Sequence, residues 1–244
     1  MDYVYQPDIN VERRYDVNLK LASNVRRESL HYLKHQLDTT LIRWAHEFSP
    51  ALSLQYNYKT GISAKEAKIS YAFSEGIPSI YYQLPTVNDS DPTNIYANNP
   101  NLRRSLSHSV NGYYSYQRHS SHSNISFGTG YGRTDHAIAY ARQYHRHTGI
   151  TKWTPQNIDG NWNANASLQY STPLGKKEAF QLQGTSAAYY LNSADFTTDT
   201  DEMMRSVVRN LTLSQHLGLT YQSGNNRVGL EGRVSWLRSR SELR

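Results

Sequence analysis

The residues of this chain that could do chemistry include ten histidines, and their spacing decides whether they could bind a metal. His119 and His122 form one close pair, and His145 and His147 form another. Neither pair belongs to an HExxH motif or to a histidine-carboxylate spacing typical of metal sites. Histidines on polar faces or in loops are ordinary, so the sequence predicts no metal site.

Other residues of the chain could in principle serve in catalysis or nucleotide binding. A serine-histidine-carboxylate triad is assembled in space, so lipid hydrolysis by such a triad stays open as an alternative. The chain has no nucleophile-elbow motif, however, and we expect that it is not an enzyme. Gly128-Thr129-Gly130, followed by Gly132, superficially resembles a phosphate loop. Because this segment lies within an alternating strand and precedes no helix, we expect no dinucleotide and no other cofactor.

Composition excludes several classes of protein. The chain has no cysteine, which excludes disulfide frameworks and zinc-thiolate sites. Its net charge of +6 comes from scattered lysines and arginines, so we expect no nucleic-acid partner. Mean hydropathy is −0.74, and no segment approaches the roughly 18 apolar residues of a membrane helix. The chain has twenty tyrosines and five phenylalanines. Tyrosine suits positions where the ring meets apolar surroundings and the hydroxyl meets water.

The stretch 207–238 predicts two long strands and their connection. Each run alternates apolar and polar side chains with a period of two, and the turn-like segment 223–226 separates them. A soluble sandwich strand averages about 5–6 residues, whereas a membrane-spanning strand needs about 9–11. Length therefore favours a transmembrane barrel over the alternative of a soluble sandwich. The expected lipid-facing set includes Leu211, Leu213, Leu217 and Leu219, and the expected lumen-facing set includes Thr212, Ser214 and His216.

The same alternation organises most of the chain. Residues 1–48 are assigned to N-terminal strands and a connection, with strands around 17–21 and 39–44. Ser49-Pro50 is predicted to end that run, and 49–244 to form part of one β-barrel domain. Further predicted hairpins pair 52–58 with 67–73, 105–118 with 125–131, and 162–170 with 180–190, with a tight turn at 172–175. The alternation is expected to continue from Tyr131 through Ile138, Tyr140 and Tyr144.

Three long polar connections separate the predicted hairpins: Leu84 to Arg104, Arg146 to Asp159, and Asn192 to Ser206. Long loops often bind ligands. An aromatic ring can stack on a solute and an amide can hydrogen-bond to it, so the substrate-binding candidates are Tyr96, Asn98 and Trp153. Short and long connections alternate along the chain, as an up-and-down barrel requires. We therefore predict an all-β fold: about eight to ten antiparallel strands that form part of a transmembrane barrel.

Two segments carry a family resemblance. Residues 73–80 read Phe-Ser-Glu-Gly-Ile-Pro-Ser-Ile, and residues 91–102 read Asp-Pro-Thr-Asn-Ile-Tyr-Ala-Asn-Asn-Pro-Asn-Leu. Both resemble the barrel of TonB-dependent receptors, in the outer-membrane β-barrel family. The family's usual glycine and final proline are missing from 98–104, so that loop departs from the family pattern. The resemblance extends through 157–164 and covers the chain from about Ser49 onward.

The resemblance implies a place in the outer membrane of a Gram-negative cell. It also implies a barrel with more strands than fit here, a plug domain and a TonB-contacting peptide, so we expect an interior fragment of a larger receptor. No secretion signal precedes the first strand, and no aromatic residue ends the chain. The expected partners are outer-membrane lipid, a small nutrient solute, and TonB through the plug. The expected function is TonB-dependent nutrient uptake; the alternative is a plug-less barrel with an adhesive or structural role.

Overall fold

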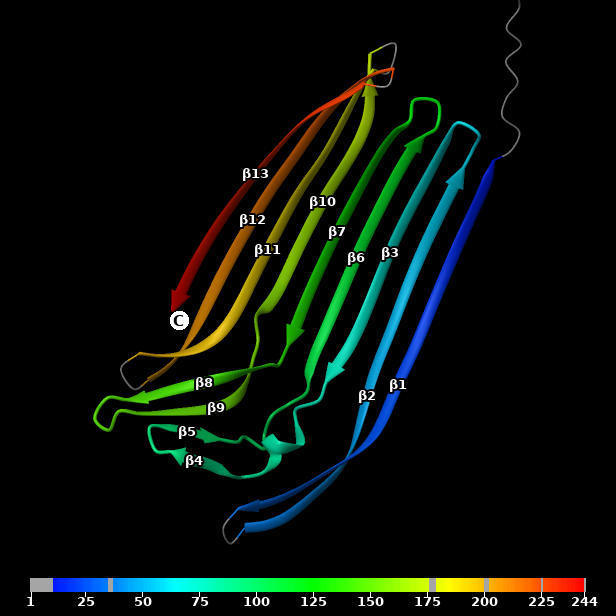
Figure 1. The fold of residues 1–244 in the computed structure, drawn as a ribbon. Helices are drawn as coiled ribbons and strands as arrows, with labels where there is room; N and C mark the ends of the chain where they lie inside the picture. Colours follow the sequence, from blue (N-terminus) through cyan, green and yellow to red (C-terminus); the bar gives the residue numbers. More distant parts are fainter. Residues whose placement is uncertain (1–10, 35–36, 176–178, 200–201, 225, 244) are drawn as a thin grey trace, which may run out of the picture.

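A computed structural model describes residues 11–34, 37–175, 179–199, 202–224 and 226–243. Within them, no helix has the length and apolar character needed to cross a membrane. Nine strands form one sheet (Figure 1), in the order β1 (Glu12–Lys34), β2 (Leu37–Lys59), β3 (Ser63–Gly76), β6 (Ser105–Arg118), β7 (Ser123–Asp135), β10 (Asn161–Leu174), β11 (Phe180–Asp199), β12 (Glu202–Ser223) and β13 (Asn226–Leu243).

Each strand of this sheet pairs with its neighbours in an antiparallel manner. The prediction of eight to ten antiparallel up-and-down strands is thus confirmed for the described residues. The sheet is not closed, because β1 and β13 are its two edges. With nine strands in strict alternation, these two edge strands run in the same direction.

The two ends of the sheet differ in their connections (Figure 1). At one end, here called the turn end, the strands are joined by short turns such as 60–62 and 119–122. At the other, the loop end, the connections 77–104 and 136–160 are long, and the hairpins β1–β2 and β11–β12 extend past their neighbours. The predicted alternation of short and long connections is therefore confirmed only in part, because β1–β2 and β11–β12 are joined by short connections at the loop end.

A second, smaller sheet lies at the loop end. It has the order β4 (Val87–Asp91), β5 (Asn94–Ala97), β9 (Ile150–Ile158) and β8 (Ala137–His145), and a short 3-10 helix, η1 (Ile80–Gln83), precedes it. Leu84 to Arg104, expected to be a long loop, contains the strands β4 and β5, and the predicted connection Arg146 to Asp159 contains β9. The predicted continuation of the wall strand through Tyr140 was wrong. The chain turns at His136, whose φ is +53°, and β8 joins the smaller sheet.

Three further predicted boundaries were wrong. Ser49-Pro50 does not end a strand, because β2 continues through it and Pro50 lies opposite Leu21. The pairing of β2 with β3 starts only at Ala51, so the missing N–H of Pro50 breaks no bond to β3. The segment from Asn192 to Ser206 is mostly the extended end of β11 and β12, and β10 continues through the predicted turn at 172–175 to Leu174.

The main sheet has one apolar and one polar face. The apolar face carries the leucine set of β12 together with residues such as Leu19, Leu54, Ile69 and Phe127, placed there by strand register. These side chains are uncovered: Leu19 is 64% exposed and Leu217 is 45% exposed. In a soluble sandwich a second sheet would bury them, and the small sheet does not, so the structure favours the barrel.

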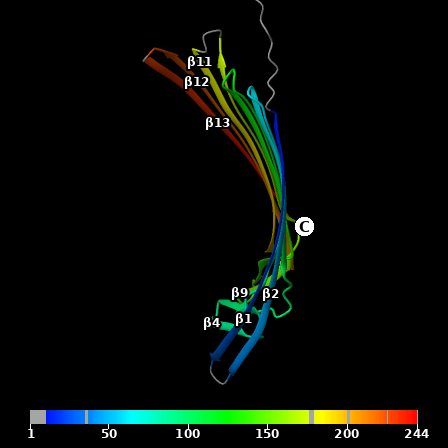
Figure 2. The same cartoon turned by 90° about the vertical axis from the view of Figure 1, so that its right-hand side faces the viewer.

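Figure 2 shows the main sheet edge-on as an arc, with the small sheet on its concave side at the loop end. On the polar face, the glycines of β7 lie where neighbouring side chains crowd together. A Cβ atom at Gly130 would lie 2.7 Å from Nδ2 of Asn165 and 2.9 Å from Oδ1 of Asn111. The polar face of this wall is therefore crowded around these glycines.

Candidate functional site

Aromatic side chains form a row across the apolar face near the loop end. Trp162 stacks on Tyr190 with ring centroids 4.9 Å apart, and Tyr131 lies 6.0 Å from Trp162 on the other side. Farther along the row, the hydroxyl of Tyr71 and Nδ1 of His108 form a 2.9 Å hydrogen bond. Amphipathic rings of this kind suit the boundary between hydrocarbon and water.

A second row crosses the apolar face near the turn end. Nζ of Lys65 lies 5.6 Å from the ring centroid of Tyr58 and 5.7 Å from that of Tyr116. Phe180 and Tyr221 contact each other with centroids 4.8 Å apart. The amine of Lys65 therefore lies among rings at the edge of the apolar face, where a cation can reach water.

The stretch between the two rows has the length of a membrane crossing. On β6 the two rows are marked by His108 and Tyr116. The stretch 108–116 between them matches the about 9–11 residues that a tilted strand needs to cross a bilayer. Within the described strands, no charged side chain lies on the apolar face between the rows. The apolar face is thus a band with aromatic borders, as in a barrel wall that faces lipid.

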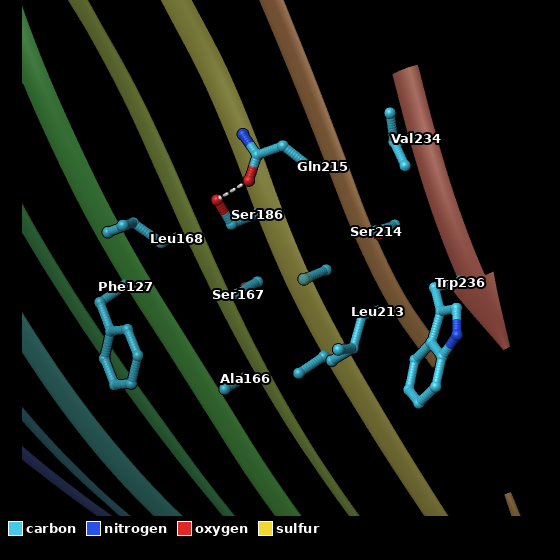
Figure 3. Close-up of a pocket in the computed structure, with 12 residues that line it drawn as sticks. Phe127, Ala166, Ser167, Leu168, Ser186, Leu213, Ser214, Gln215, Val234 and Trp236 are labelled. Carbon is cyan, nitrogen blue, oxygen red and sulfur yellow. Dashed lines mark hydrogen bonds between the residues drawn. The ribbon is translucent and has the colours of Figure 1, made fainter. Parts of the chain in front are cut away.

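One polar pair interrupts this band. The hydroxyl of Ser186 donates a hydrogen bond to Oε1 of Gln215, and Nε2 of Gln215 donates to the backbone carbonyl of His216 at 3.2 Å (Figure 3). They line a recess of about 410 Å³ whose apolar border includes Phe127, Leu213 and Trp236. Because an unpaired polar group in hydrocarbon is costly, the mutual bond makes this pair compatible with a lipid-facing surface.

Asparagine side chains hold the loop-end connections together. Asn157 accepts a 2.7 Å hydrogen bond from the backbone N–H of Arg103 and donates a 3.0 Å bond to the carbonyl of the same residue. Asn99 donates a 3.0 Å bond to the carbonyl of Pro155. These contacts hold the end of the 77–104 connection beside the end of β9, so two of the segments that resemble the family, 91–102 and 157–164, lie close together.

The structure brings two of the three predicted binding residues together. Tyr96 of β5 stacks on Trp153 of β9, with ring centroids 6.2 Å apart and an interplanar angle of 11°. Cζ of Arg142, on β8, lies 5.7 Å from the Trp153 ring centroid. Asn98 does not join this row: its Nδ2 donates to the carbonyl of Tyr81 at 2.9 Å and to Oγ1 of Thr86 at 3.1 Å. Asn98 therefore fixes the loop beside η1.

Two polar groups on the small sheet and its turns have shifted pKa values. The hydroxyls of Tyr140 and Tyr82 lie 2.7 Å apart, and burial together with this hydrogen bond raises the pKa of Tyr140 to about 12. Hydrogen bonds from Thr93 and Asn94 lower the pKa of Asp91 to about 2. At neutral pH Tyr140 is therefore a neutral link between β8 and η1, and Asp91 is an ionised cap of the β4–β5 turn.

A cleft of about 570 Å³ lies between β8 and the extended end of β11. Its polar groups include Arg142 and Asp195, and its apolar lining includes Trp153 and Phe196. Nε1 of Trp153 is buried and has no hydrogen-bond partner in the described part of the chain. The volume falls within the about 300–1,000 Å³ typical of ligand sites. Among the described residues, no three histidine or acidic side chains are placed to hold a metal ion.

A family model for an outer membrane protein β-barrel family matches residues 28–229. The chain belongs to this family. Comparison with curated proteins and with solved structures gave no match. The match supports the barrel and the outer-membrane location that the sequence predicted, and it does not distinguish TonB-dependent receptors from other members.

Membership in this family indicates which end of the barrel is external and which face of the sheet meets lipid. In outer membrane β-barrels the short turns face the periplasm and the long connections face outward, so the loop end of this barrel is the external one. The apolar band meets lipid, and the polar face, with Asn111, Asn165 and Ser214, meets the lumen. The small sheet and its cleft therefore lie at the external mouth.

Apart from Trp153, sequence reasoning missed the charged and aromatic residues of the cleft, which are Tyr140, Arg142, Asp195 and Phe196. One signal could have revealed the first two. The apolar positions of β7 are odd, including Phe127 and Tyr131, whereas those of β8 are even. Such a shift by one residue cannot occur within a single regular strand, because it exchanges the two faces. It indicates a break between the two segments, where the structure has His136.

Proposed function

We propose that this outer membrane β-barrel takes part in TonB-dependent uptake of a small nutrient solute. The observation that carries the proposal is the cleft at the external mouth, where Trp153, Arg142 and Asp195 offer stacking and charge to a solute. The resemblance of 73–80 and 91–102 to TonB-dependent receptors supports it. The role requires binding and passage, and we propose no catalytic group, metal or cofactor.

The open edges of the sheet bear on this proposal. Hydrocarbon does not tolerate unpaired strand edges, so β1 and β13 must be paired in the membrane. Since they run in the same direction, direct contact between them would be parallel, whereas barrels of this kind pair antiparallel strands. An odd number of further strands would restore the antiparallel pattern. We propose a wider barrel of that kind, whose lumen has room for a plug.

Loss of the gene is expected to slow the removal of a particular solute from the growth medium. Complemented and deletion cells would be compared by mass spectrometry of spent medium, with and without an uncoupler of the proton gradient. TonB coupling draws on that gradient, so the uncoupler should abolish the difference. Cells carrying Trp153→Ala should resemble the deletion, and Lys152→Ala, on the other face of β9, should not.

Three outcomes would contradict the proposal in different ways. If no solute differs between the strains, the barrel has the adhesive or structural role. If the difference survives the uncoupler, passage is passive. If Trp153→Ala and Lys152→Ala behave alike at equal surface levels, the cleft is not the binding site.

A further inference from the structure

Arginines continue the loop-end row of aromatic side chains on β12 and β13. Strand pairing places Tyr190 of that row level with Arg238, and Trp162 level with Arg209 and Arg240. Side chains two residues apart on a strand share a face, so all three arginines lie on the face that carries the apolar band. Where other strands have rings at the border between hydrocarbon and water, these two strands therefore have cations.

The three arginines carry more charge than the carboxylate beside them neutralises. Oε1 of Glu242 lies 3.2 Å from Nη1 of Arg209 and 3.2 Å from Nε of Arg240, so two guanidinium groups share one carboxylate. Arg238 forms no ion pair within the described ranges. Three positive groups and one negative group leave an excess of two positive charges at the border of the apolar band.

Other arginines near the same row have carboxylates of their own. On β7, Nη2 of Arg133 lies 2.7 Å from Oδ1 of Asp135. Just before β6, Nη1 of Arg104 lies 2.9 Å from Oε2 of Glu75. These two arginines are each balanced by one acid, so the excess charge near this row is concentrated on β12 and β13.

The recess of about 410 Å³ on the apolar face lies beside these arginines, on the side of the turn end (Figure 3). Small side chains form its floor: Ala166 lies opposite Ala188, and Ser186 follows on the same face of β11. Trp236 borders the recess and is two residues from Arg238, roughly 7 Å at about 3.4 Å per residue. Because this face meets lipid, an acyl chain is the apolar group available to fill the recess.

We infer that Arg209, Arg238, Arg240 and the adjoining recess form a site for a phosphorylated lipid of the external leaflet. Guanidinium groups form paired, charge-assisted hydrogen bonds with phosphate oxygens, so the arginines hold the anionic headgroup at the border of the band. An acyl chain of the same lipid lies in the recess. The lipid belongs to the external leaflet because the loop end of the barrel is external. This site is on the outer surface of the wall, so the inference goes beyond the proposed uptake through the lumen.

Native mass spectrometry of the full chain, folded in detergent micelles, tests this inference with phosphatidylglycerol as the probe. Phosphatidylcholine with the same acyl chains is the comparison, because its choline group balances the charge of the phosphate. Phosphatidylglycerol is expected to bind at least fivefold more tightly, and glycerol phosphate, which lacks the chains, should not displace it. Equal binding of the two lipids would overturn recognition of the headgroup. Displacement by glycerol phosphate at the concentration of the lipid would indicate a site for free anions and overturn the lipid.

Variants separate the two halves of the site. Combining Arg238→Gln with Arg240→Gln removes the excess charge and should bring the affinities for the two lipids to within twofold of each other. Arg233→Gln, which removes a positive charge from the opposite face of β13, should preserve the difference. Ala188→Phe fills the recess and should weaken both lipids, whereas Ala67→Phe, the same change on the apolar face of β3, should weaken neither.

The comparison of two lipids on the unchanged protein does not depend on how the variants fold. A preference for phosphatidylglycerol that survives the double arginine variant would overturn the role of the arginines. Unchanged lipid binding in Ala188→Phe would overturn the role of the recess. A dimer that separates into single chains in Ala188→Phe would identify a second copy of the chain, in place of lipid, as the occupant of the recess.

Discussion

Arginine in place of Leu213 is expected to destabilise the folded barrel by about 2–4 kcal/mol, because it places a charge on the lipid-facing band. Leu213 lies between Ala188 and Trp236 on the neighbouring strands and is 41% exposed. The measurement is urea unfolding of the protein in lipid bilayers, extrapolated linearly to water.

Ser214→Arg is the matched control, since it puts the same side chain on the same strand one residue away. Ser214 lies opposite Ala187 and Ser235 on the polar face, so the new arginine would extend into the aqueous lumen. We expect a change within about 0.5 kcal/mol, as for ordinary surface substitutions. Similar costs for the two variants would mean that the two faces meet the same medium.

Alanine in place of Gly130 is the second substitution with a large expected effect. Its Cβ would lie between Asn165 and Asn111, at 2.7 Å from Nδ2 of the first and 2.9 Å from Oδ1 of the second. Overpacking of this kind costs about 1–3 kcal/mol. The same unfolding experiment measures it.

Gly232→Ala on β13 provides the comparison for Gly130→Ala. No atom lies within 4 Å of a Cβ built at Gly232, apart from its own chain neighbours. Replacing such a glycine removes freedom from the unfolded chain, so we expect stability to be equal or higher by up to about 1 kcal/mol. A loss in Gly232→Ala as large as that in Gly130→Ala would argue against crowding as the cause.

The wall of the barrel could be predicted from sequence because the bilayer imposes a pattern on it. Between the aromatic rows one face meets hydrocarbon and the other meets water, so apolar and polar residues must alternate. The hairpins formed by β6 with β7 and by β12 with β13 therefore follow the predicted alternation closely. Turn residues such as Gly224, with φ of +57°, marked where the chain reverses.

The loop end could not be predicted in the same way, because both faces of its strands meet water or protein. The ends of β11 and β12 past Asn192 are acidic and rich in threonine, and they show no alternation that would separate strand from loop. The small sheet depends on contacts between distant segments, such as the parallel pairing of β5 with β9. No local pattern indicates such a pairing. Tyr96 and Trp153 were found by residue type, whereas their stacking follows from that pairing.

Site-directed spin labelling along β12 tests the central claim, that this sheet is a membrane wall with one face in lipid and the other in water. The chain has no cysteine, so single cysteines at positions 211 to 219 can be labelled without removing any native one. In bilayers, collision with oxygen should peak at odd positions such as 213 and 217, and collision with a water-soluble nickel complex should peak at even positions such as 214 and 216. Loss of this alternation, or exclusion of both reagents from the odd positions, would contradict the account.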